Sequence, residues 1–176
     1  MISDSESPLL AFYRGTGRDG AGRLLCEIRH WTDERLEYTH DFIQWLFPLR
    51  ERSQFNYDAP VLDAQTVAAF LADDGLRAEL RASLQCMLAF YGLELHEGAV
   101  RRTVRFEERS RAWVTAGNHN HLRITRILKS LVVLGLEDEA RAFFACLTEL
   151  YEKERRLTRG RISTETFGYW AEALRG

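Results

Sequence analysis

The chain is short of cysteine, lysine and long apolar runs, and each shortage excludes a class of protein. Its three cysteines, Cys26, Cys86 and Cys146, lie far apart without a CxxC spacing, which argues against a disulfide framework and a thiolate zinc site. No apolar run approaches the ~18 residues of a transmembrane helix. The start, MISDSESPLL, lacks the basic and apolar segments of a signal peptide. We therefore expect a cytoplasmic protein without membrane insertion.

The chain also lacks a large excess of charge of either sign. The formal net charge is −2 over 176 residues, of which 28% are charged, so bulk charge predicts neither nucleic-acid nor membrane binding. The length fits one compact domain over residues 1–176, and we expect residues 1–7 to form a disordered tail. Only two lysines, Lys129 and Lys153, accompany many arginines, which indicates a GC-rich, bacterial genome.

The feature that dominates the sequence is the helical spacing of its apolar residues, without the period-two alternation of strands. This spacing predicts an all-α fold, a single-domain bundle of about seven or eight helices with a buried central helix near 120–134. One short extended pair is expected near residues 93–103. Capping signals predict helix starts at Ser7, Thr32, Asp63 and Ser163 and glycine-capped helix ends at Gly92 and Gly135.

Two of the predicted helices carry a narrow polar sector on an otherwise apolar surface. The helix near 120–134 is apolar around most of its circumference, as expected of a helix at the centre of a bundle. Its polar sector consists of His119, Arg123, Arg126 and Ser130. A second helix is predicted from Asp33 to about Leu46, ended by Pro48, and its polar sector offers carboxylates and other acceptors from Glu37, His40, Asp41 and Gln44.

The two polar sectors suggest two hypotheses. Because an unpaired buried charge is very costly, the guanidinium groups and the carboxylates can face each other in a buried ionic network. Alternatively, both sectors line a cleft that binds an anion or a polar ligand. The candidate site under either hypothesis consists of Glu37, His40, Asp41, Gln44, His119, Asn120, His121, Arg123 and Arg126.

More specific chemistry has weaker support in the sequence. His119 and His121 form an HxH pair, but on a helix their side chains point about 200° apart. Local hydrogen bonds, together with a helix cap from Asn118 or Asn120, explain these residues more simply than metal binding does. The His40-Asp41 dipeptide is similar to that of metal-dependent phosphohydrolases, but these enzymes need further His and Asp ligands on other helices, for which His30 and Asp138 are the only loose candidates. We therefore expect no catalytic residue, no metal and no cofactor.

A basic run over Arg101–Arg111 raises the alternative of nucleic-acid binding. The run has Phe106 and Trp113 interleaved with its arginines, a pattern typical of proteins that bind single-stranded nucleic acid. Glu107 and Glu108 dilute the charge, and a solvated helix face with i,i+4 pairs explains the run more simply. Nucleic acid is therefore an unfavoured partner.

Several blocks of the sequence carry a resemblance to a known family. The segments HDFIQWLFPLRE at 40–51 and HNHLRITRILKSL at 119–131 resemble the two signature blocks of the opioid growth factor receptor conserved-domain family. LAFYRG at 10–15, YGLEL at 91–95 and LGLEDEA at 134–140 agree with it in the expected order. The resemblance covers roughly residues 8–150.

The resemblance implies a receptor-like binding module and no established catalytic residues. Vertebrate members are described as intracellular receptors for the peptide met-enkephalin, and they carry a long C-terminal extension that this sequence, a short bacterial member by its composition, does not include. A bacterial origin makes the enkephalin ligand unsuitable for transfer. The expected partner is therefore an unknown peptide, protein or anionic small molecule.

Overall fold

The computed structural model describes residues 7–175, so most of the predicted tail over residues 1–7 lies outside the described residues, as does Gly176. The chain divides into two compact units, Met1–Ser83 and Leu84–Gly176, and each is described by itself. The prediction of a single domain over 1–176 therefore stays a prediction.

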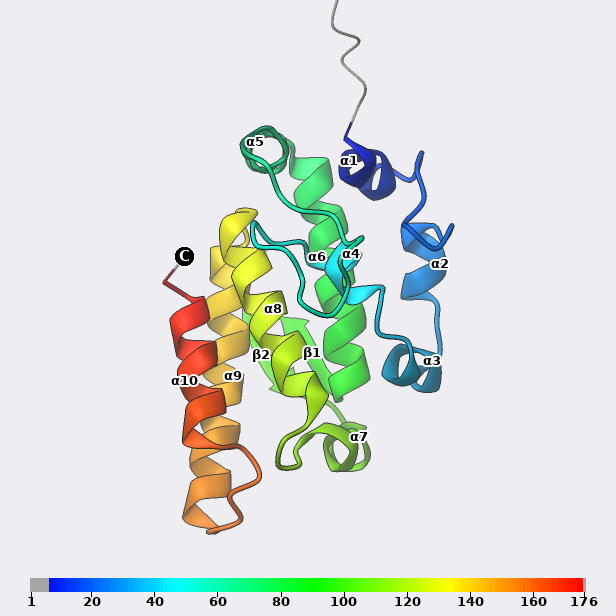
Figure 1. Ribbon diagram of the computed structural model, residues 1–176. Helices are drawn as coiled ribbons and strands as arrows, with labels where there is room; N and C mark the ends of the chain where they lie inside the picture. Colours follow the sequence, from blue (N-terminus) through cyan, green and yellow to red (C-terminus); the bar gives the residue numbers. More distant parts are fainter. Residues whose placement is uncertain (1–6, 176) are drawn as a thin grey trace, which may run out of the picture. The chain divides into compact units, whose positions relative to one another are not determined.

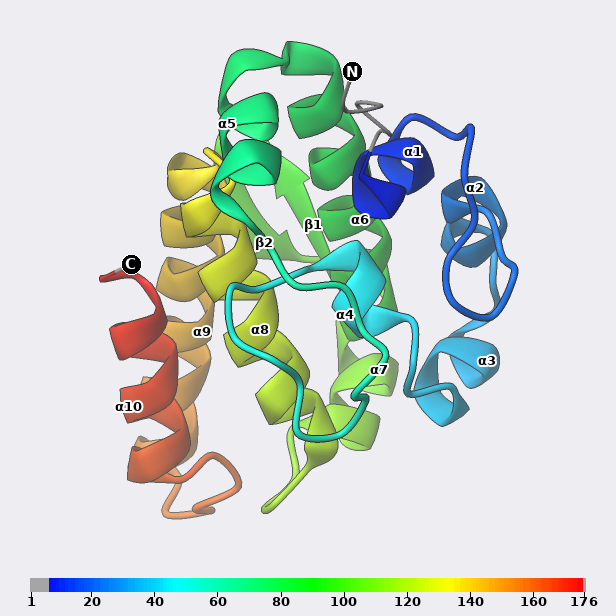
Figure 2. The ribbon, with the colours of Figure 1, turned by 45° about the horizontal axis from the view of Figure 1, so that its top comes forward.

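The first unit consists of short helices and the start of a long one (Figures 1 and 2). The helices are α1 (Pro8–Tyr13), α2 (Leu25–Arg29), α3 (Asp33–Tyr38), α4 (Ile43–Leu46), α5 (Ala64–Ala72) and the beginning of α6 (Asp74–Tyr91). The predicted caps at Thr32 and Asp63 are confirmed, because their side chains accept hydrogen bonds from the backbone N–H groups of Arg35 and Thr66. Ser7 occupies the predicted N-cap position of α1, but its side chain makes no capping hydrogen bond. Pro8 occupies the first turn of α1, where its missing N–H costs nothing.

Aromatic residues fill the core of the first unit. Phe12 lies edge-on to Trp45 with ring centroids 5.3 Å apart, and Tyr13 lies edge-on to Phe70 at 4.8 Å. The Tyr13 hydroxyl donates to the Leu46 carbonyl, so its polar atom is satisfied in the apolar interior. Burial raises the pKa of Tyr13 well above its ordinary value, because the charged phenolate would lose its hydration.

The second unit contains the longest helices and the sheet. The end of α6 leads into the antiparallel hairpin of β1 (Leu93–His96) and β2 (Ala99–Arg102), which is followed by α7 (Phe106–Trp113), α8 (His119–Val133), α9 (Glu137–Arg156) and α10 (Thr164–Ala173). Helix α8 packs against α7, α9 and α10, and β2 packs against α9. The hairpin confirms the extended pair expected near residues 93–103.

Gly92 is the residue that turns the chain from α6 into the hairpin. Its φ is +79°, and a Cβ added there would lie 2.7 Å from the Phe106 Cα and 3.0 Å from the Arg109 Cβ. An L side chain would therefore meet both backbone strain and a clash with α7. The predicted glycine-capped end of α6 is confirmed. The absence of a side chain at Gly92 also allows the start of the hairpin to lie close to α7.

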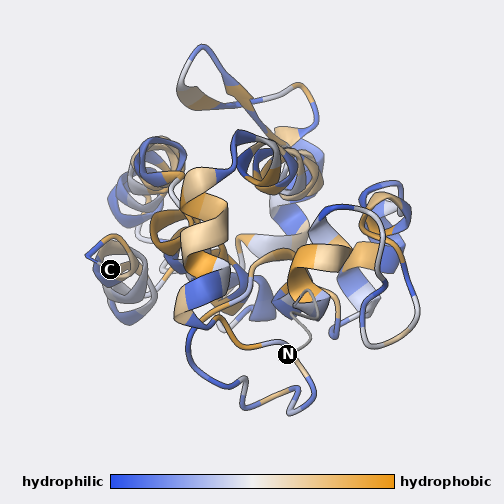
Figure 3. Ribbon diagram, turned by 90° about the horizontal axis from the view of Figure 1, so that it is seen from above, coloured by the Kyte–Doolittle hydropathy of each residue, from blue (hydrophilic) through white to orange (hydrophobic). Residues whose placement is uncertain are grey.

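The all-α prediction is right in broad terms, since about 60% of the chain is helical. The predicted number of helices is wrong, because residues 7–175 contain ten helices in addition to the two-stranded sheet. One cause is that the helix predicted from Asp33 to Leu46 is broken between α3 and α4. Thr39 adopts an extended conformation, with φ −95° and ψ 128°, and ends α3. In Figure 3 most helices show one hydrophobic and one hydrophilic side, as amphipathic helices do.

None of the helices over residues 7–175 is long and apolar enough to cross a membrane.

Candidate functional site

The start of α8 is a capped helix terminus. The Asn118 Oδ1 atom accepts a hydrogen bond of 2.9 Å from the Asn120 backbone N–H, while its Nδ2 donates to the Ala112 carbonyl and the Thr115 hydroxyl at 2.9 Å each. Asn118 therefore satisfies an otherwise orphaned N–H of the helix and ties the preceding loop to the end of α7. This confirms the predicted asparagine cap.

A series of three hydrogen bonds runs through the interior of the second unit. Trp170 Nε1 donates to the His121 carbonyl at 3.1 Å, His121 Nε2 bonds to the Trp113 carbonyl at 2.9 Å, and Trp113 Nε1 donates to the Tyr91 carbonyl at 3.1 Å. Because a carbonyl only accepts, His121 donates from Nε2. The series, which we call the indole–imidazole series, links α10, the start of α8, the end of α7 and the end of α6.

His121 is held in its neutral form. Burial lowers the pKa of its imidazole, and the hydrogen bond to the Trp113 carbonyl offsets only part of this effect. Its ring also lies edge-on to Trp170, with centroids 5.6 Å apart. The prediction that this histidine forms local hydrogen bonds is thus confirmed, and its geometry is that of a structural residue.

The polar sector of α8 is more buried than part of its apolar surface. Arg123 is only 5% exposed, and its Nη1 donates to the Asn120 Oδ1 at 3.3 Å. Ser130 is also buried, whereas Leu122 is 57% exposed. The prediction that α8 is buried on most of its circumference is therefore wrong at Leu122, but right along Ile124, Ile127, Leu128 and Leu131.

In the first unit, the predicted polar sector does not form a single helix face. Glu37 lies in α3 and Gln44 in α4, whereas His40 and Asp41 lie in the break between these helices and are exposed. The Asp41 carboxylate bonds to the Arg23 guanidinium at 2.9 Å. Gln44 is buried, and its Oε1 has no hydrogen-bond partner among residues 7–175.

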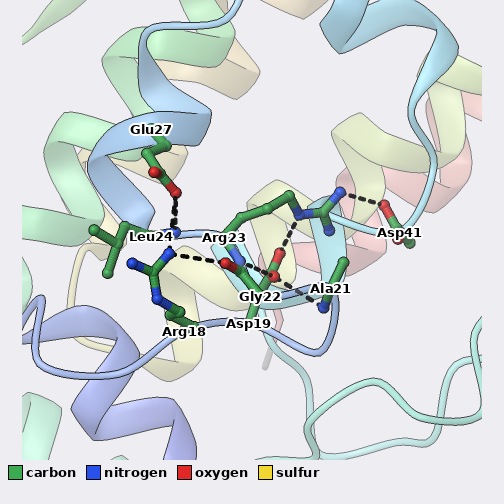
Figure 4. Close-up of polar contacts among 8 residues, drawn as sticks. All are labelled: Arg18, Asp19, Ala21, Gly22, Arg23, Leu24, Glu27 and Asp41. Carbon is green, nitrogen blue, oxygen red and sulfur yellow. Dashed lines mark hydrogen bonds and ion pairs between the residues drawn. The ribbon is translucent and has the colours of Figure 1, made fainter.

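The partner of Asp41 belongs to a compact loop whose polar contacts sequence reasoning missed (Figure 4). The buried Asp19 carboxylate accepts hydrogen bonds from the backbone N–H groups of Ala21 and Arg23, at 3.0 and 2.8 Å, and from the Arg23 Nε at 2.6 Å. Arg23 thus bridges Asp19 and Asp41. The composition RGTGRDG indicates a loop, but no spacing rule pairs Arg23 with a carboxylate 18 residues away.

The basic run over Arg101–Arg111 does not present its aromatic residues to solvent. The two aromatic residues of the basic run, Phe106 and Trp113, are buried, so they offer no face on which a base could stack. Arg102 lies over the Phe106 ring and Arg101 pairs with Glu94 at 2.8 Å.

Within residues 7–175, no three His, Cys, Asp or Glu side chains gather as a group that could hold a metal. The expected absence of a metal stays a prediction.

The described part of the first unit contains a cavity of about 410 Å³, which we call the α1–α2–α6 cavity. Tyr13, Leu25 and Leu76 supply apolar lining, and two ion pairs supply charge: Arg14 lies 3.6 Å from Asp73, and Arg29 bonds to Glu79. The Cys26 thiol is a further lining group on an exposed residue. The cavity therefore offers both signs of charge beside an apolar surface.

Sequence reasoning did not predict this cavity, because its charged residues come from three separate segments that share no motif. The clearest local signal is at Asp73, whose Oδ1 accepts hydrogen bonds from the N–H groups of Gly75 and Leu76 at 2.8 and 3.3 Å. Such a pattern predicts a helix cap. It does not predict that Arg14 lies beside the same carboxylate.

The described residues are thus mostly helical, with a charged cavity in the first unit and a capped, largely buried polar segment at the start of α8 in the second. The chain belongs to the opioid growth factor receptor family, because residues 6–176 match the family described as the opioid growth factor receptor conserved region. This confirms the resemblance seen in the sequence. No solved structure matches the chain.

Curated relatives support the same family. The chain is 38% identical to the human opioid growth factor receptor over 141 residues, which is 76% of this chain and 20% of the relative, and 44% identical to the mouse receptor over 73% of this chain and 21% of the relative. It is 41% identical to the rat opioid growth factor receptor-like protein 1 over 59% of this chain and 22% of the relative. The chain spans about a fifth of the length of these relatives. They are vertebrate proteins and give the predicted bacterial origin no support.

Proposed function

We propose that the chain is a non-enzymatic binding domain and that the α1–α2–α6 cavity receives a short peptide with free termini. The observation that carries the proposal is the combination, in one cavity of about 410 Å³, of two guanidinium groups, two carboxylates and an apolar lining. A volume of this size lies within the ~300–1,000 Å³ range of small-ligand sites. The relatives' names include the word receptor, which agrees with a binding role.

The charges of the cavity suit a ligand that itself carries both signs. The Arg14–Asp73 pair is partly exposed and its closest nitrogen–oxygen distance is 3.6 Å, so it is screened by solvent and weak. A carboxylate and an ammonium group of a ligand can therefore replace the pair at little cost. The terminal carboxylate of a peptide would gain a bidentate contact with the Arg14 guanidinium. The side chains of the peptide would contact Leu25 and Leu76.

The predicted polar sectors supply a second candidate region. Their pairing in a buried ionic network or their lining of a ligand cleft stays a proposal, since the two sectors belong to different units. For Arg123, the buried-network hypothesis is favoured over the ligand cleft, because Arg123 is buried and donates a hydrogen bond to Asn120. The phosphohydrolase alternative at His40 and Asp41 is less favoured, because the Asp41 carboxylate is engaged by Arg23.

The test is a titration of the ¹⁵N-labelled chain with a panel of short peptides that includes met-enkephalin, each with free and with blocked termini. We expect at least one free peptide to shift the resonances of the cavity residues and its acetylated, amidated form to bind more weakly. Arg14→Gln should weaken binding without loss of folding, because Arg14 is partly exposed.

A matched control is available in the same unit. Arg18 is similarly exposed and lies 3.6 Å from Glu27, but it does not line the cavity. Arg18→Gln should leave peptide binding unchanged. Equal loss of binding in both variants, or equal binding of free and blocked peptides, would contradict the proposed role of the cavity.

A further inference from the structure

A second cavity lies in the described part of the C-terminal unit, where α9 ends and α10 begins. Its volume is about 410 Å³, and its lining consists of Tyr151, Arg155, Thr158, Gly160, Ile162, Ser163 and Thr164. Unlike the α1–α2–α6 cavity, it includes no carboxylate among its lining residues. Its polar lining is a guanidinium group, several hydroxyls and backbone.

The segment beside this cavity concentrates positive charge. Residues 152–161 contain two carboxylates and five cations, a net charge of +3, in a chain whose net charge is −2. The five cations are Lys153, Arg155, Arg156, Arg159 and Arg161. Such a local excess attracts anions even where the chain as a whole does not.

Two arginines of this segment, Arg161 and Arg155, differ in how tightly a carboxylate binds their guanidinium groups. Arg161 makes two hydrogen bonds of 2.6 Å to the buried Glu154 carboxylate, through Nε and Nη2, so this pair is neutralised and orders the loop. Arg155 is 68% exposed at its side chain, and its Nε lies 3.7 Å from the Glu152 Oε2. That distance is too long for a hydrogen bond, so the Arg155 fork can turn to another anion.

We propose that this cavity binds an oxyanion of the phosphate class. Arg155 would supply paired N–H donors, and the Thr164 hydroxyl, whose oxygen accepts a hydrogen bond from the Tyr151 hydroxyl at 3.4 Å, would add a neutral donor. The Ser163 hydroxyl does not serve as a donor to the anion, because it donates to the Thr166 Oγ1 at 3.0 Å. Thr164 lies at the start of α10, whose dipole favours an anion. The inference is independent of the peptide cavity, which belongs to the other unit.

The experiment is a ¹H–¹⁵N titration of the whole chain with inorganic phosphate at constant ionic strength, maintained with sodium chloride. We expect saturable shifts confined to residues 151–164. Arg155→Gln should weaken binding by roughly tenfold, the loss expected for a charge-assisted hydrogen bond. Arg155→Lys should recover part of it, because lysine keeps the charge but lacks the fork.

A matched control lies on the same helix. Arg141 is exposed and pairs with Glu137 four residues earlier, outside the cavity, so Arg141→Gln should leave phosphate binding unchanged. A second arm uses phospho-L-serine: tighter binding than inorganic phosphate would identify a phosphate monoester as the ligand, and weaker binding would identify free phosphate. Shifts that do not saturate with either probe, or that are equal in Arg155→Gln and the wild type, would overturn the proposal.

Discussion

Replacing His121 by phenylalanine tests the role of the indole–imidazole series. The substitution retains an aromatic ring beside Trp170, whose ring lies edge-on to His121 at 5.6 Å, but removes the donor to the Trp113 carbonyl. The carbonyl is then left buried without this partner, which costs about 1–3 kcal/mol. For a chain of this length the melting temperature should fall by roughly 2–12 °C, measured by calorimetry or tryptophan fluorescence.

The pH dependence provides a second, independent readout. Burial lowers the pKa of His121 in the folded chain, so below its ordinary value of about 6.5 the unfolded chain binds more protons than the folded one. Stability is therefore fully present above pH 6.5 and decreases as the pH falls toward the folded pKa. His121→Phe removes this contribution, so its stability deficit relative to the wild type should shrink as the pH is lowered from 7.5 to 5.

The exposed His96 of β1 supplies the control. His96→Gln should retain both the melting temperature and the acid sensitivity of the wild type. The reasoning is refuted if His121→Phe melts at the wild-type temperature, or if it loses stability on acidification as steeply as the wild type does. Either result would mean that the imidazole is not a buried donor on which the second unit depends.

Four further predictions concern other parts of the chain. Gly92→Ala should destabilise by more than the ~1–2 kcal/mol of a left-handed alanine, and by more than Gly98→Ala, which has a similar φ of +77° but no atom within 4 Å of the added Cβ; equal urea midpoints would contradict this. Hydrogen bonds from Arg161 lower the pKa of Glu154, so stability should fall on acidification below about pH 4.5, and Glu154→Gln should flatten that decrease in an acid-unfolding series. Arg123→Ala should lower the melting temperature markedly, because breaking a buried network costs roughly 3–5 kcal/mol, whereas wild-type melting would favour an open ligand site. Elemental analysis of the purified protein should find no stoichiometric zinc, iron or manganese, and one metal per chain would revive the phosphohydrolase alternative.

Local chemistry made several helix starts predictable. The caps at Thr32, Asp63, Asn118 and Ser163 are confirmed, because each depends on one side chain and an N–H two or three residues away. The glycine at the end of α6 is predictable because helices commonly end at a residue in the left-handed conformation, which glycine adopts without strain. The hairpin follows from a short polar segment between helices.

Features that depend on distant residues were not predictable. The break between α3 and α4 removes His40 and Asp41 from any common helix face, and the apolar periodicity of residues 33–46 gives no sign of it. The pairing of Arg23 with Asp41 and the meeting of Arg14 with Asp73 join residues that are 18 and 59 positions apart. Sequence periodicity describes one element at a time, so it could identify candidate charges but not choose their partners.

The most direct test of the proposed function uses Cys26 as a reporter of the α1–α2–α6 cavity. Cys26 is exposed and lines this cavity, whereas Cys146 is buried and burial raises the pKa of its thiol to about 11. In a Cys86→Ser variant, the rate of reaction with a disulfide reagent therefore reports on Cys26, since the reagent requires an accessible thiolate. A peptide that binds the chain in a separate calorimetric titration should slow this reaction in proportion to its occupancy. Saturating peptide binding with an unchanged Cys26 reaction rate would contradict the account.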